Sequence, residues 1–407
     1  MSSDARKPRV AVVSPFLDKS HGTERTVIEW ITRLTSEFEL HIYSQHVEDV
    51  DLSNIKWHRI PNLRGPHLFN YLWWFAANHL WRTWHRRSRG LHYDVVFTPG
   101  VNCFDADVIS VHIVFGEFLR RVRSQLQFSS NPVLFWPRLL HRRLYYRLIV
   151  FLERHLYSDP KTPLVVYARK TIGDLERLYR RRESCLLVYL GLDHAIYNPG
   201  RRAELRQTSR TTLRIPEARL QLLMVGNDWH KKGIRVLLES LLLMQYNPVD
   251  LMLVGGEDPA PFRAMVAKKR LEGRIRFLPP RRDIEFYYAA ADIYVGPSLE
   301  DTFALPPQEA MACGIPVIVS RENGACEIIT HGVDGFVLDD PTDADSLASM
   351  ISKLHGDPEL RARIGENAAQ TARQFTWEQN AREIGGLFRQ IIRRKSRADQ
   401  QTLAQES

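Results

Sequence analysis

Residues 292–317 read DIYVGPSLEDTFALPPQEAMACGIPV, and this stretch decides the fold. An apolar strand pattern ends at Gly296, and a polar loop leads to Pro306 and Pro307, which are well tolerated in the first turn of a helix. Gly314 is expected to end that helix, and another apolar run follows it. A strand, a loop, a helix and a second strand in so short a stretch predict one βαβ element of a parallel sheet.

The same alternation of short apolar runs with longer helical patterns extends along the chain of 407 residues. Near-continuous apolar strands are typical of buried parallel sheets. The predicted strands fall in two series, 9–14, 40–43, 95–98, 108–112, 164–167 and 186–190, then 220–225, 250–254, 275–278, 292–295, 316–319 and 336–338. Two such series predict an α/β protein with two doubly wound, Rossmann-like domains.

Composition agrees with a globular protein, because 44% of the residues are hydrophobic and 25% are charged. Residues 198–216 are rich in Arg, Thr and Pro, so we expect an interdomain linker there. Residues 396–407 are polar and are expected to form a disordered tail. No signal peptide or membrane-spanning segment is expected, since the best apolar candidate, 68–81, is short and contains polar residues. Four separate cysteines predict neither a disulfide framework nor a zinc site.

A candidate anion site lies at the start of the helix predicted near Leu305. The N–H groups and the dipole of a helix start attract a diphosphate. Asp301 in the loop and Glu309 within the helix add carboxylates, which can accept hydrogen bonds from the vicinal hydroxyls of a ribose. A favourable charge near a helix N-terminus is the other interpretation of Glu309, and on these residues alone both stay open.

A second candidate loop follows the predicted strand 220–225 and reads GNDWHKKG over residues 226–233. Its Lys232 lies where the loop meets the next helix, a place where a mobile ammonium group suits a phosphate. Lys231 and Asn227 belong to the same loop. A pair of lysines facing solvent is the alternative interpretation.

These two segments resemble the signature of the retaining family 4 glycosyltransferases, which belong to the glycosyl transferases group 1. That signature has two acidic residues eight apart around an F-G-L-P core, followed by E-A-M-A-x-G-x-P-V. Phe303, Leu305 and Pro306 match the core, and residues 309–317, EAMACGIPV, match the end. Further matches run along nearly the whole chain, at residues 190–199, 255–256, 324–337 and 375–377.

The resemblance implies a GT-B fold, in which two Rossmann-like domains with parallel sheets face a central cleft. It implies an acceptor-side domain over 1–197 and a nucleotide-sugar-binding domain over 217–375. It also implies a C-terminal helix over 376–395 that crosses back to the N-terminal domain.

The resemblance also implies residue roles. Glu309 would bind the ribose, Asp301 the donor sugar and Lys232 the diphosphate. Three residues depart from the family pattern, since Asp301 replaces a glutamate, Ala304 a glycine and Asn227 an arginine. The expected catalytic residues are His112, Asp301 and Lys232, and the expected donor-binding residues are Gly22, Asn227, Lys231, Lys232, Phe303, Ala304, Leu305 and Glu309.

Two of these residues come from the N-terminal half. The segment 21–25, HGTER, resembles the family's G-G-x-E-R element, and Gly22 would let backbone amides approach the donor phosphates. Helix capping is the alternative role for its Thr23 and Glu24. His112 ends a predicted strand, where ligands gather in open α/β sheets, and a purely structural histidine is its alternative.

The formal net charge is +9, which favours an anionic partner. Residues 64–147 hold twelve arginines against four acidic residues, with many Trp and Tyr residues between them. This mixture is typical of an interfacial membrane element, so we expect contact with an anionic membrane. Packing of the aromatic residues inside the domain is the alternative. No nucleic-acid-binding module is present in the sequence.

The sequence therefore predicts a retaining hexosyltransferase-like enzyme that uses a nucleoside diphosphate sugar and a hydroxyl acceptor, saccharide or lipid-linked, in envelope polysaccharide or glycolipid synthesis. No metal or cofactor is expected, because lysine and a helix dipole can offset the charge of the leaving diphosphate. A cytoplasmic protein is expected, with contact to the inner face of the membrane left open. The alternatives are a non-catalytic GT-B module that binds nucleotide or lipid for a partner enzyme and, more remotely, a sugar-nucleotide epimerase.

Overall fold

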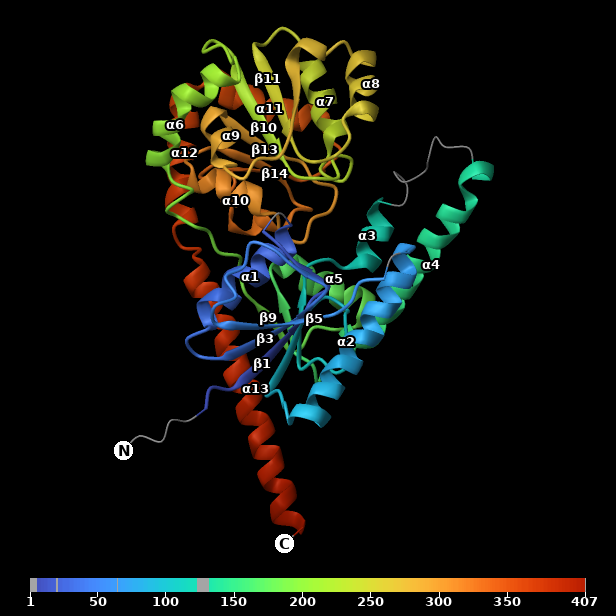
Figure 1. Ribbon diagram of the computed structural model, residues 1–407. Helices are drawn as coiled ribbons and strands as arrows, with labels where there is room; N and C mark the ends of the chain where they lie inside the picture. The colour runs from blue at the N-terminus through green and yellow to red at the C-terminus, as the bar shows by residue number, and fades with distance from the viewer. Residues whose placement is uncertain (1–5, 20, 64, 123–131, 407) are drawn as a thin grey trace. The chain divides into compact units, whose positions relative to one another are not determined.

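The computed structural model describes residues 6–19, 21–63, 65–122 and 132–406, with 121, 122, 132–139, 399 and 402–406 described by their backbone alone. The described chain divides into two compact units. Unit 1 comprises residues 6–119, 132–191 and 377–406, and unit 2 comprises residues 192–376 with 120–122. Figure 1 gives the labels of the elements.

Unit 1 contains a seven-stranded parallel sheet with the order β5-β3-β1-β6-β7-β8-β9. Its strands are β1 (Arg9–Val13), β3 (Glu39–Ser44), β5 (Ile55–Arg59), β6 (Val95–Pro99), β7 (Val108–Val111), β8 (Leu164–Val166) and β9 (Cys185–Leu187), with a separate pair, β2 (Phe16–Leu17) and β4 (His46–Val47). Its helices are α1 (Gly22–Leu34), α2 (His67–Arg89), α3 (Phe115–Val122), α4 (Pro132–Tyr157), α5 (Arg169–Tyr179) and α13 (Trp377–Glu406).

Unit 2 contains a six-stranded parallel sheet with the order β12-β11-β10-β13-β14-β15. Its strands are β10 (Leu220–Val225), β11 (Val249–Val254), β12 (Ile275–Leu278), β13 (Ile293–Gly296), β14 (Val317–Ser320) and β15 (Phe336–Leu338). Its helices are α6 (Pro199–Thr212), α7 (Ile234–Leu243), α8 (Ala260–Lys268), α9 (Glu285–Ala290), α10 (Leu305–Ala312), α11 (Ala344–Gly356) and α12 (Pro358–Ala372), with 3-10 turns η1 (Glu272–Arg274) and η2 (Gly324–Ile328).

Numbered within each unit, both sheets share the strand order 3-2-1-4-5-6, which unit 1 extends by one strand. This order defines a doubly wound, Rossmann-like sheet. The central strands are buried from end to end, as β6 and β11 show, because helices cover both faces of such a sheet. The predicted α/β class with two Rossmann-like units is therefore confirmed.

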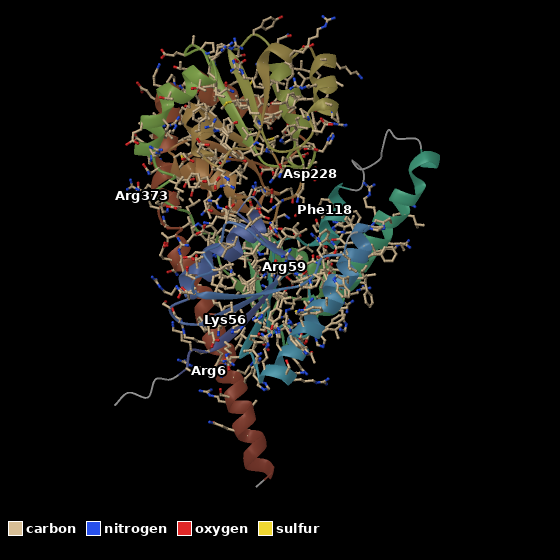
Figure 2. All side chains as sticks on the ribbon, in the orientation of Figure 1. Arg6, Lys56, Arg59, Phe118, Asp228 and Arg373 are labelled. Carbon is tan, nitrogen blue, oxygen red and sulfur yellow. The ribbon has the colours of Figure 1, made fainter. Side chains whose placement is uncertain are left out.

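Three strands of unit 1 were not predicted: the short pair β2 and β4, and β5, which belongs to the seven-stranded sheet. β5 lies at the edge of the sheet and carries the exposed Lys56 and Arg59, labelled in Figure 2. An edge strand covers only part of its surface, so it tolerates the charges that hide an apolar run. The continuous pattern used to find the buried strands misses such a segment.

Most of the segment 198–216, which the sequence predicts as a linker, forms the helix α6 (Pro199–Thr212) in the structure. Asn198 caps α6 by accepting a hydrogen bond from the Arg201 N–H at 2.8 Å, and Pro199 occupies its first turn. Three arginines one turn apart then reach the carboxyl end of α9. The bonds join Arg202 to Ala291 O at 2.8 Å, Arg206 to Ala289 O at 3.2 Å and Arg210 to Ala290 O at 3.1 Å. Hydrogen bonds and charge, rather than apolar residues, dock this helix.

The C-terminal helix also differs from its expected extent. α13 packs against α1 in unit 1, where Phe388 contacts Trp30 with ring centroids 5.6 Å apart. The predicted disordered tail, 396–407, is helical as far as Glu406. Because a helix already anchored at Trp377 needs no new nucleus, polar residues with ordinary helix propensity can extend it.

A cluster of histidines lies between β3, β5 and α2 in unit 1. His41 Nδ1 and His58 Nε2 are 2.8 Å apart, and the rings of His58 and His85 lie 4.6 Å apart. Tyr43 joins the cluster through its hydroxyl, 2.6 Å from His85 Nδ1. Burial, and then the positive charges of its neighbours, lower the pKa of His58 to about 3. The folded protein therefore holds this imidazole neutral.

This cluster predicts acid sensitivity of the fold. The folded pKa of His58 lies below the unfolded value of about 6.5, so its stabilisation is present above pH 6.5 and is lost as pH falls toward 3. One such group changes the free energy of unfolding by at most about 1.4 kcal/mol per pH unit. His58→Gln should reduce the fall in Tm of the full chain between pH 7.5 and pH 5.5.

The exposed His46 provides the matched control, because its imidazole meets solvent in both states. His46→Gln should keep the parent's pH dependence. Glu24 and Glu153, whose pKa values burial raises to about 7, act in the opposite sense, but they act equally in parent and variant. The same fall in Tm for His58→Gln as for the parent would show that this cluster does not resist protonation.

Candidate functional site

The candidate site of unit 2 lies where its strand order reverses, between β10 and β13. In a doubly wound sheet the chain continues to opposite faces of the sheet from the two strands at such a reversal. Ligands of open α/β sheets bind at this point, at the carboxyl ends of the strands. The loop 226–233 follows β10, and the loop 297–304 follows β13. These loops carry most of the residues that the sequence singles out.

Lys232 crosses from the first loop to the second. Its side chain lies against Gly226, where an added Cβ would come within 3.0 Å of Lys232 Cε. A side chain at position 226 would therefore push the lysine away. Nζ of Lys232 reaches the carboxylate of Asp301 and forms an ion pair with it, and both side chains are mostly buried.

The backbone of Asp301 is itself held from a third segment. Its N–H donates to Glu322 O at 2.9 Å, and its carbonyl accepts from the Gly324 N–H at 3.0 Å. The loop after β14 thus supports the loop after β13. The carboxylate that faces Lys232 consequently stands on a backbone with little freedom.

Glu309 lies in α10 and is buried, with 3% of its surface exposed. The hydroxyl of Tyr288, from α9, donates to Glu309 Oε2 at 2.7 Å. The same tyrosine lies 3.3 Å from Pro306 O in the first turn of α10. Tyr288 therefore ties the orientation of the Glu309 carboxylate to the start of its own helix.

The carboxylates of Asp301 and Glu309 act on one common group. Burial, followed by the negative charges of Asp301 and Glu309, raises the pKa of Tyr294 on β13. The structure pairs Lys232 with Asp301 in the loop after β13, and this loop leads into α10, the helix that holds Glu309.

The start of α10 differs in detail from a simple anion site. Pro306 and Pro307 lack N–H groups, so within its first four residues only Leu305 and Gln308 keep a backbone donor. Ala304 takes φ −90° and ψ 129°, a conformation open to any residue, so the glycine usual in the family is not required by the backbone here. The dipole of α10 remains, but much of the positive charge that an anionic ligand needs here must come from Lys232.

The other residues predicted for this site have varied positions. Lys231 forms an ion pair with Glu300, with Nζ and Oε2 3.0 Å apart. Asn227 accepts the Gly256 N–H at 2.8 Å and so joins the loops after β10 and β11. Phe303 is partly buried between Asp301 and the start of α10.

Gly22 and His112 belong to unit 1. Gly22 opens α1, and a Cβ added there would meet no atom within 4 Å, so the packing of unit 1 does not require a glycine. His112 follows β7, with Nε2 3.0 Å from Ser110 Oγ and 3.3 Å from the Tyr167 hydroxyl. Burial lowers the pKa of His112 to about 3, so its imidazole is neutral at pH 7.

The sequence did not identify two residues of this site, Tyr288 and Glu300, as partners of the predicted residues. Tyr288 lies in a run of aromatic and small residues before β13, and a buried tyrosine generally needs an acceptor for its hydroxyl. Glu300 adjoins Asp301, and its side chain is 2% exposed. The sequence feature that could have indicated both ion pairs is the presence of two adjacent lysines, 231 and 232, and two adjacent carboxylates, 300 and 301.

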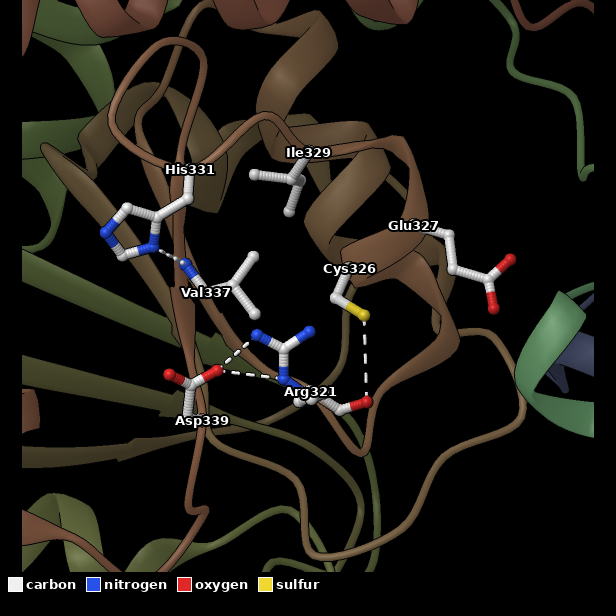
Figure 3. A pocket seen from close by; sticks show the side chains of 7 residues that line it. All are labelled: Arg321, Cys326, Glu327, Ile329, His331, Val337 and Asp339. Carbon is white, nitrogen blue, oxygen red and sulfur yellow. Dashed lines mark hydrogen bonds and ion pairs between the residues drawn. The ribbon is translucent and has the colours of Figure 1, made fainter.

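Unit 2 also has a surface cavity beyond this cluster, at the ends of β14 and β15 (Figure 3). It is lined by Arg321, Cys326, Glu327, Ile329, His331, Val337 and Asp339. Figure 3 shows Arg321 directed at Asp339, while His331 Nδ1 accepts the Val337 N–H at 3.2 Å. The cavity contains none of the predicted donor-binding residues.

Comparisons with known proteins bear on the whole arrangement. Residues 206–371 match the family model "Glycosyl transferases group 1". Two relatives named D-inositol 3-phosphate glycosyltransferase are 31% identical over 245 residues in Corynebacterium efficiens and 33% identical over 249 residues in Corynebacterium glutamicum. These matches cover 56% and 58% of this chain and only 57% and 58% of the relatives' length.

Solved structures share the architecture at lower identity. WaaG, a glycosyltransferase involved in lipopolysaccharide biosynthesis, superimposes with a TM-score of 0.77 at 20% identity, over 93% of this chain and 99% of that one. Anabaena Alr3699/HepE, solved with UDP-glucose, gives a TM-score of 0.68 at 21% identity, over 94% and 99%. These likenesses show the GT-B fold. The family match covers most of unit 2, so this unit is similar to the glycosyl transferases group 1.

Proposed function

We propose that the protein is a retaining glycosyltransferase that moves a hexosyl group from a nucleoside diphosphate sugar to a hydroxyl acceptor. The observation that carries this proposal is the ion pair of Lys232 with Asp301, in the loop that leads from β13 into α10, the helix that holds Glu309. One cation and two carboxylates at a strand-order reversal suit a ligand with a diphosphate, a pentose and a sugar. The names of the relatives favour a catalytic protein over a non-catalytic binding module.

The ion pair between Lys232 and Asp301 suggests how a donor would enter. The diphosphate would replace Asp301 at the Lys232 ammonium, and hydroxyls of the donor sugar would replace Lys232 at the Asp301 carboxylate. Each partner would exchange one charged or polar contact for another, which limits the cost of separating them. Glu309, held by Tyr288, would accept hydrogen bonds from the ribose.

Transfer would break the bond between the anomeric carbon and the diphosphate oxygen and form a bond to the acceptor oxygen. The electron pair of the broken bond would stay on the diphosphate, where Lys232 and the dipole of α10 oppose the growing negative charge. The acceptor hydroxyl would pass its proton to the departing diphosphate oxygen as the new bond forms. A neutral His112 could take part by hydrogen bonding, but could not supply a positive charge.

The donor is the first property to test. Anabaena Alr3699/HepE was solved with UDP-glucose, which supports a UDP-sugar as the first candidate for this chain. The purified full chain should release a nucleoside diphosphate from one member of a panel of UDP-, GDP- and ADP-hexoses, and release should rise when a polyol or saccharide acceptor is added. Release from no member of the panel would contradict the proposed activity.

Glu309→Gln should weaken donor use selectively. Each hydrogen bond to a charged carboxylate contributes about 1.5–3 kcal/mol, so the KM for the donor should rise roughly tenfold to a hundredfold. The variant keeps the shape of the side chain and an oxygen for the Tyr288 hydroxyl, so Tm should change little. Steady-state kinetics with the donor varied provide the measurement.

Glu366→Gln, an exposed change on α12, is the control and should keep the parent's KM. An unchanged donor KM in Glu309→Gln would remove this residue from the donor site. A loss of Tm as large as the loss of activity would instead point to a structural role.

We further propose a peripheral contact of unit 1 with an anionic membrane, near a lipid-linked or envelope acceptor. Among the helices that the structure describes, none combines the length and apolar character needed to cross a bilayer. α2 nevertheless exposes large apolar side chains along one face: Phe69, Leu72, Leu80 and Trp84 are 64%, 45%, 58% and 54% exposed. Their spacing of three, eight and four residues places them in one stripe.

The rest of the aromatic residues divide between core and surface. Trp74 is buried and Trp73 and Trp81 are partly buried, so internal packing accounts for these three. Phe135 and Trp136 have side chains outside the described set. The last turn of α2 adds the exposed arginines 86, 87 and 89, and α4 exposes Leu140, Leu144 and Phe151 with arginines 143, 147 and 154. Exposed apolar groups beside arginines suit an anionic lipid surface.

A flotation assay checks this contact. The full chain should float with vesicles of phosphatidylglycerol and phosphatidylcholine, and the combined change Phe69→Ser, Leu80→Ser and Trp84→Ser should reduce binding at least about tenfold, because each side chain contributes some 1.5–3 kcal/mol when fully buried. Tyr246→Ser in unit 2, where Tyr246 is 92% exposed, should leave binding unchanged. No flotation of the parent chain would contradict the membrane contact.

A further inference from the structure

The loop that carries Lys232 is held against the loop of Asp301 by three contacts, at Gly233 and Lys231. The first contact is that of Gly233, directly after the lysine. Its φ is +85°, and a Cβ placed there would lie 2.1 Å from Pro297 O. Only a glycine permits both this conformation and this close approach of the two backbones.

The second and third contacts are made by Lys231, directly before Lys232. Its carbonyl accepts the Leu299 N–H at 2.8 Å. Its ammonium forms the ion pair with Glu300, whose side chain is 2% exposed against 14% for Lys231. Backbone and side chain of Lys231 are thus both attached to the loop after β13.

The surroundings of Lys231 favour its ammonium form. Burial opposes the charged form of Lys231, but attraction by Glu300 and then Asp301 outweighs it, and the pKa of Lys231 is raised. A buried pair of this kind is costly to break on one side, because the remaining charge is left without a partner. The pair therefore resists separation of the two loops.

We propose that Lys231 and Glu300 are positioning residues, whose buried ion pair fixes the loop 226–233 so that Lys232 meets the donor diphosphate. This inference rests on the proposed transferase function and assigns Lys231 a role other than direct contact with the donor. Lys232 stands between two fastened residues, Lys231 and Gly233, so its backbone cannot shift while both contacts hold. The Lys232–Asp301 pair opens for the donor, and the Lys231–Glu300 pair stays closed.

The test compares Lys231→Met, Glu300→Gln and the double variant Lys231→Met/Glu300→Met in the full chain. Replacing both partners with apolar residues of similar length removes the buried charges together, so the double variant should keep a Tm near that of the parent. Its kcat/KM should still fall about tenfold to a hundredfold, since small misplacements of a catalytic group have effects of this size. The loss should appear mainly in kcat, because Lys232 would act on charge that develops during the reaction.

The surface pair Lys269–Glu239, 3.7 Å apart in the same unit, supplies the matched control. Lys269→Met/Glu239→Met should keep the kcat and KM of the parent. A purely structural role of the buried pair predicts the opposite pattern in the double variant at positions 231 and 300, with parental kcat once Tm is restored. That result would overturn the proposal.

Hydrogen exchange of the ligand-free chain gives a second readout that needs no substrate. The Leu299 amide should exchange at least about tenfold faster in Lys231→Met than in the parent, and at the parental rate in Lys269→Met, because only the first change releases the loops. Equal exchange in all three proteins would also overturn the proposal. A parent chain that turns over no nucleotide sugar would instead refute the proposed transferase function, and with it any role of the pair in turnover.

Discussion

In a doubly wound sheet, the chain must leave two adjacent strands in opposite directions at one place. In unit 2 this place is the boundary between β10 and β13, and the constraint has direct consequences. Ligands of open α/β sheets bind at such a boundary, at the carboxyl ends of the strands. The loop 226–233 and the loop 297–304 supply the charged groups, and the loop after β14 supports them from behind.

The charges at this boundary are balanced before any ligand arrives. Lys231 pairs with Glu300, and Lys232 pairs with Asp301. The two pairs differ in burial, since Glu300 is 2% exposed and Asp301 is 14% exposed. A carboxylate that is closed to solvent is suited to hold a loop, whereas a carboxylate that keeps some exposure is suited to exchange its partner. In the roles that we propose, two adjacent ion pairs of the same chemistry divide the support of the loop from the binding of the donor.

Much of the fold was predictable because buried parallel strands leave an unbroken apolar pattern. All twelve predicted strands overlap strands of the two sheets, and Gly314 follows α10 as expected. The apolar pattern did not predict the elements whose surfaces carry polar side chains. β5 carries Lys56 and Arg59 at a sheet edge, and α6 docks through the stripe of Arg202, Arg206 and Arg210.

The candidate site also has residues that the sequence could identify and residues that it could not. Lys232, Asp301 and Glu309 could be chosen from the motif, since they stand at the positions of the family signature that they resemble. Their supporting partners could not be chosen, because Tyr288 meets Glu309 and Glu300 meets Lys231 only through the tertiary fold. Asn227 stays a predicted donor-binding residue, and the structure adds that its side-chain oxygen accepts a backbone N–H from Gly256. Composition alone does not reveal which polar residue serves the backbone and which serves a ligand.

The central claim is that Lys232 binds the diphosphate of a ligand while Glu309 binds the pentose of the same ligand. Titration calorimetry tests it most directly, using whichever of UDP, GDP and ADP binds best, its monophosphate, and its 2′,3′-dideoxy form. The account predicts that Lys232→Met removes the preference for diphosphate over monophosphate, and that Glu309→Gln removes the preference for the intact ribose. Equal weakening of all three ligands by both variants would contradict it.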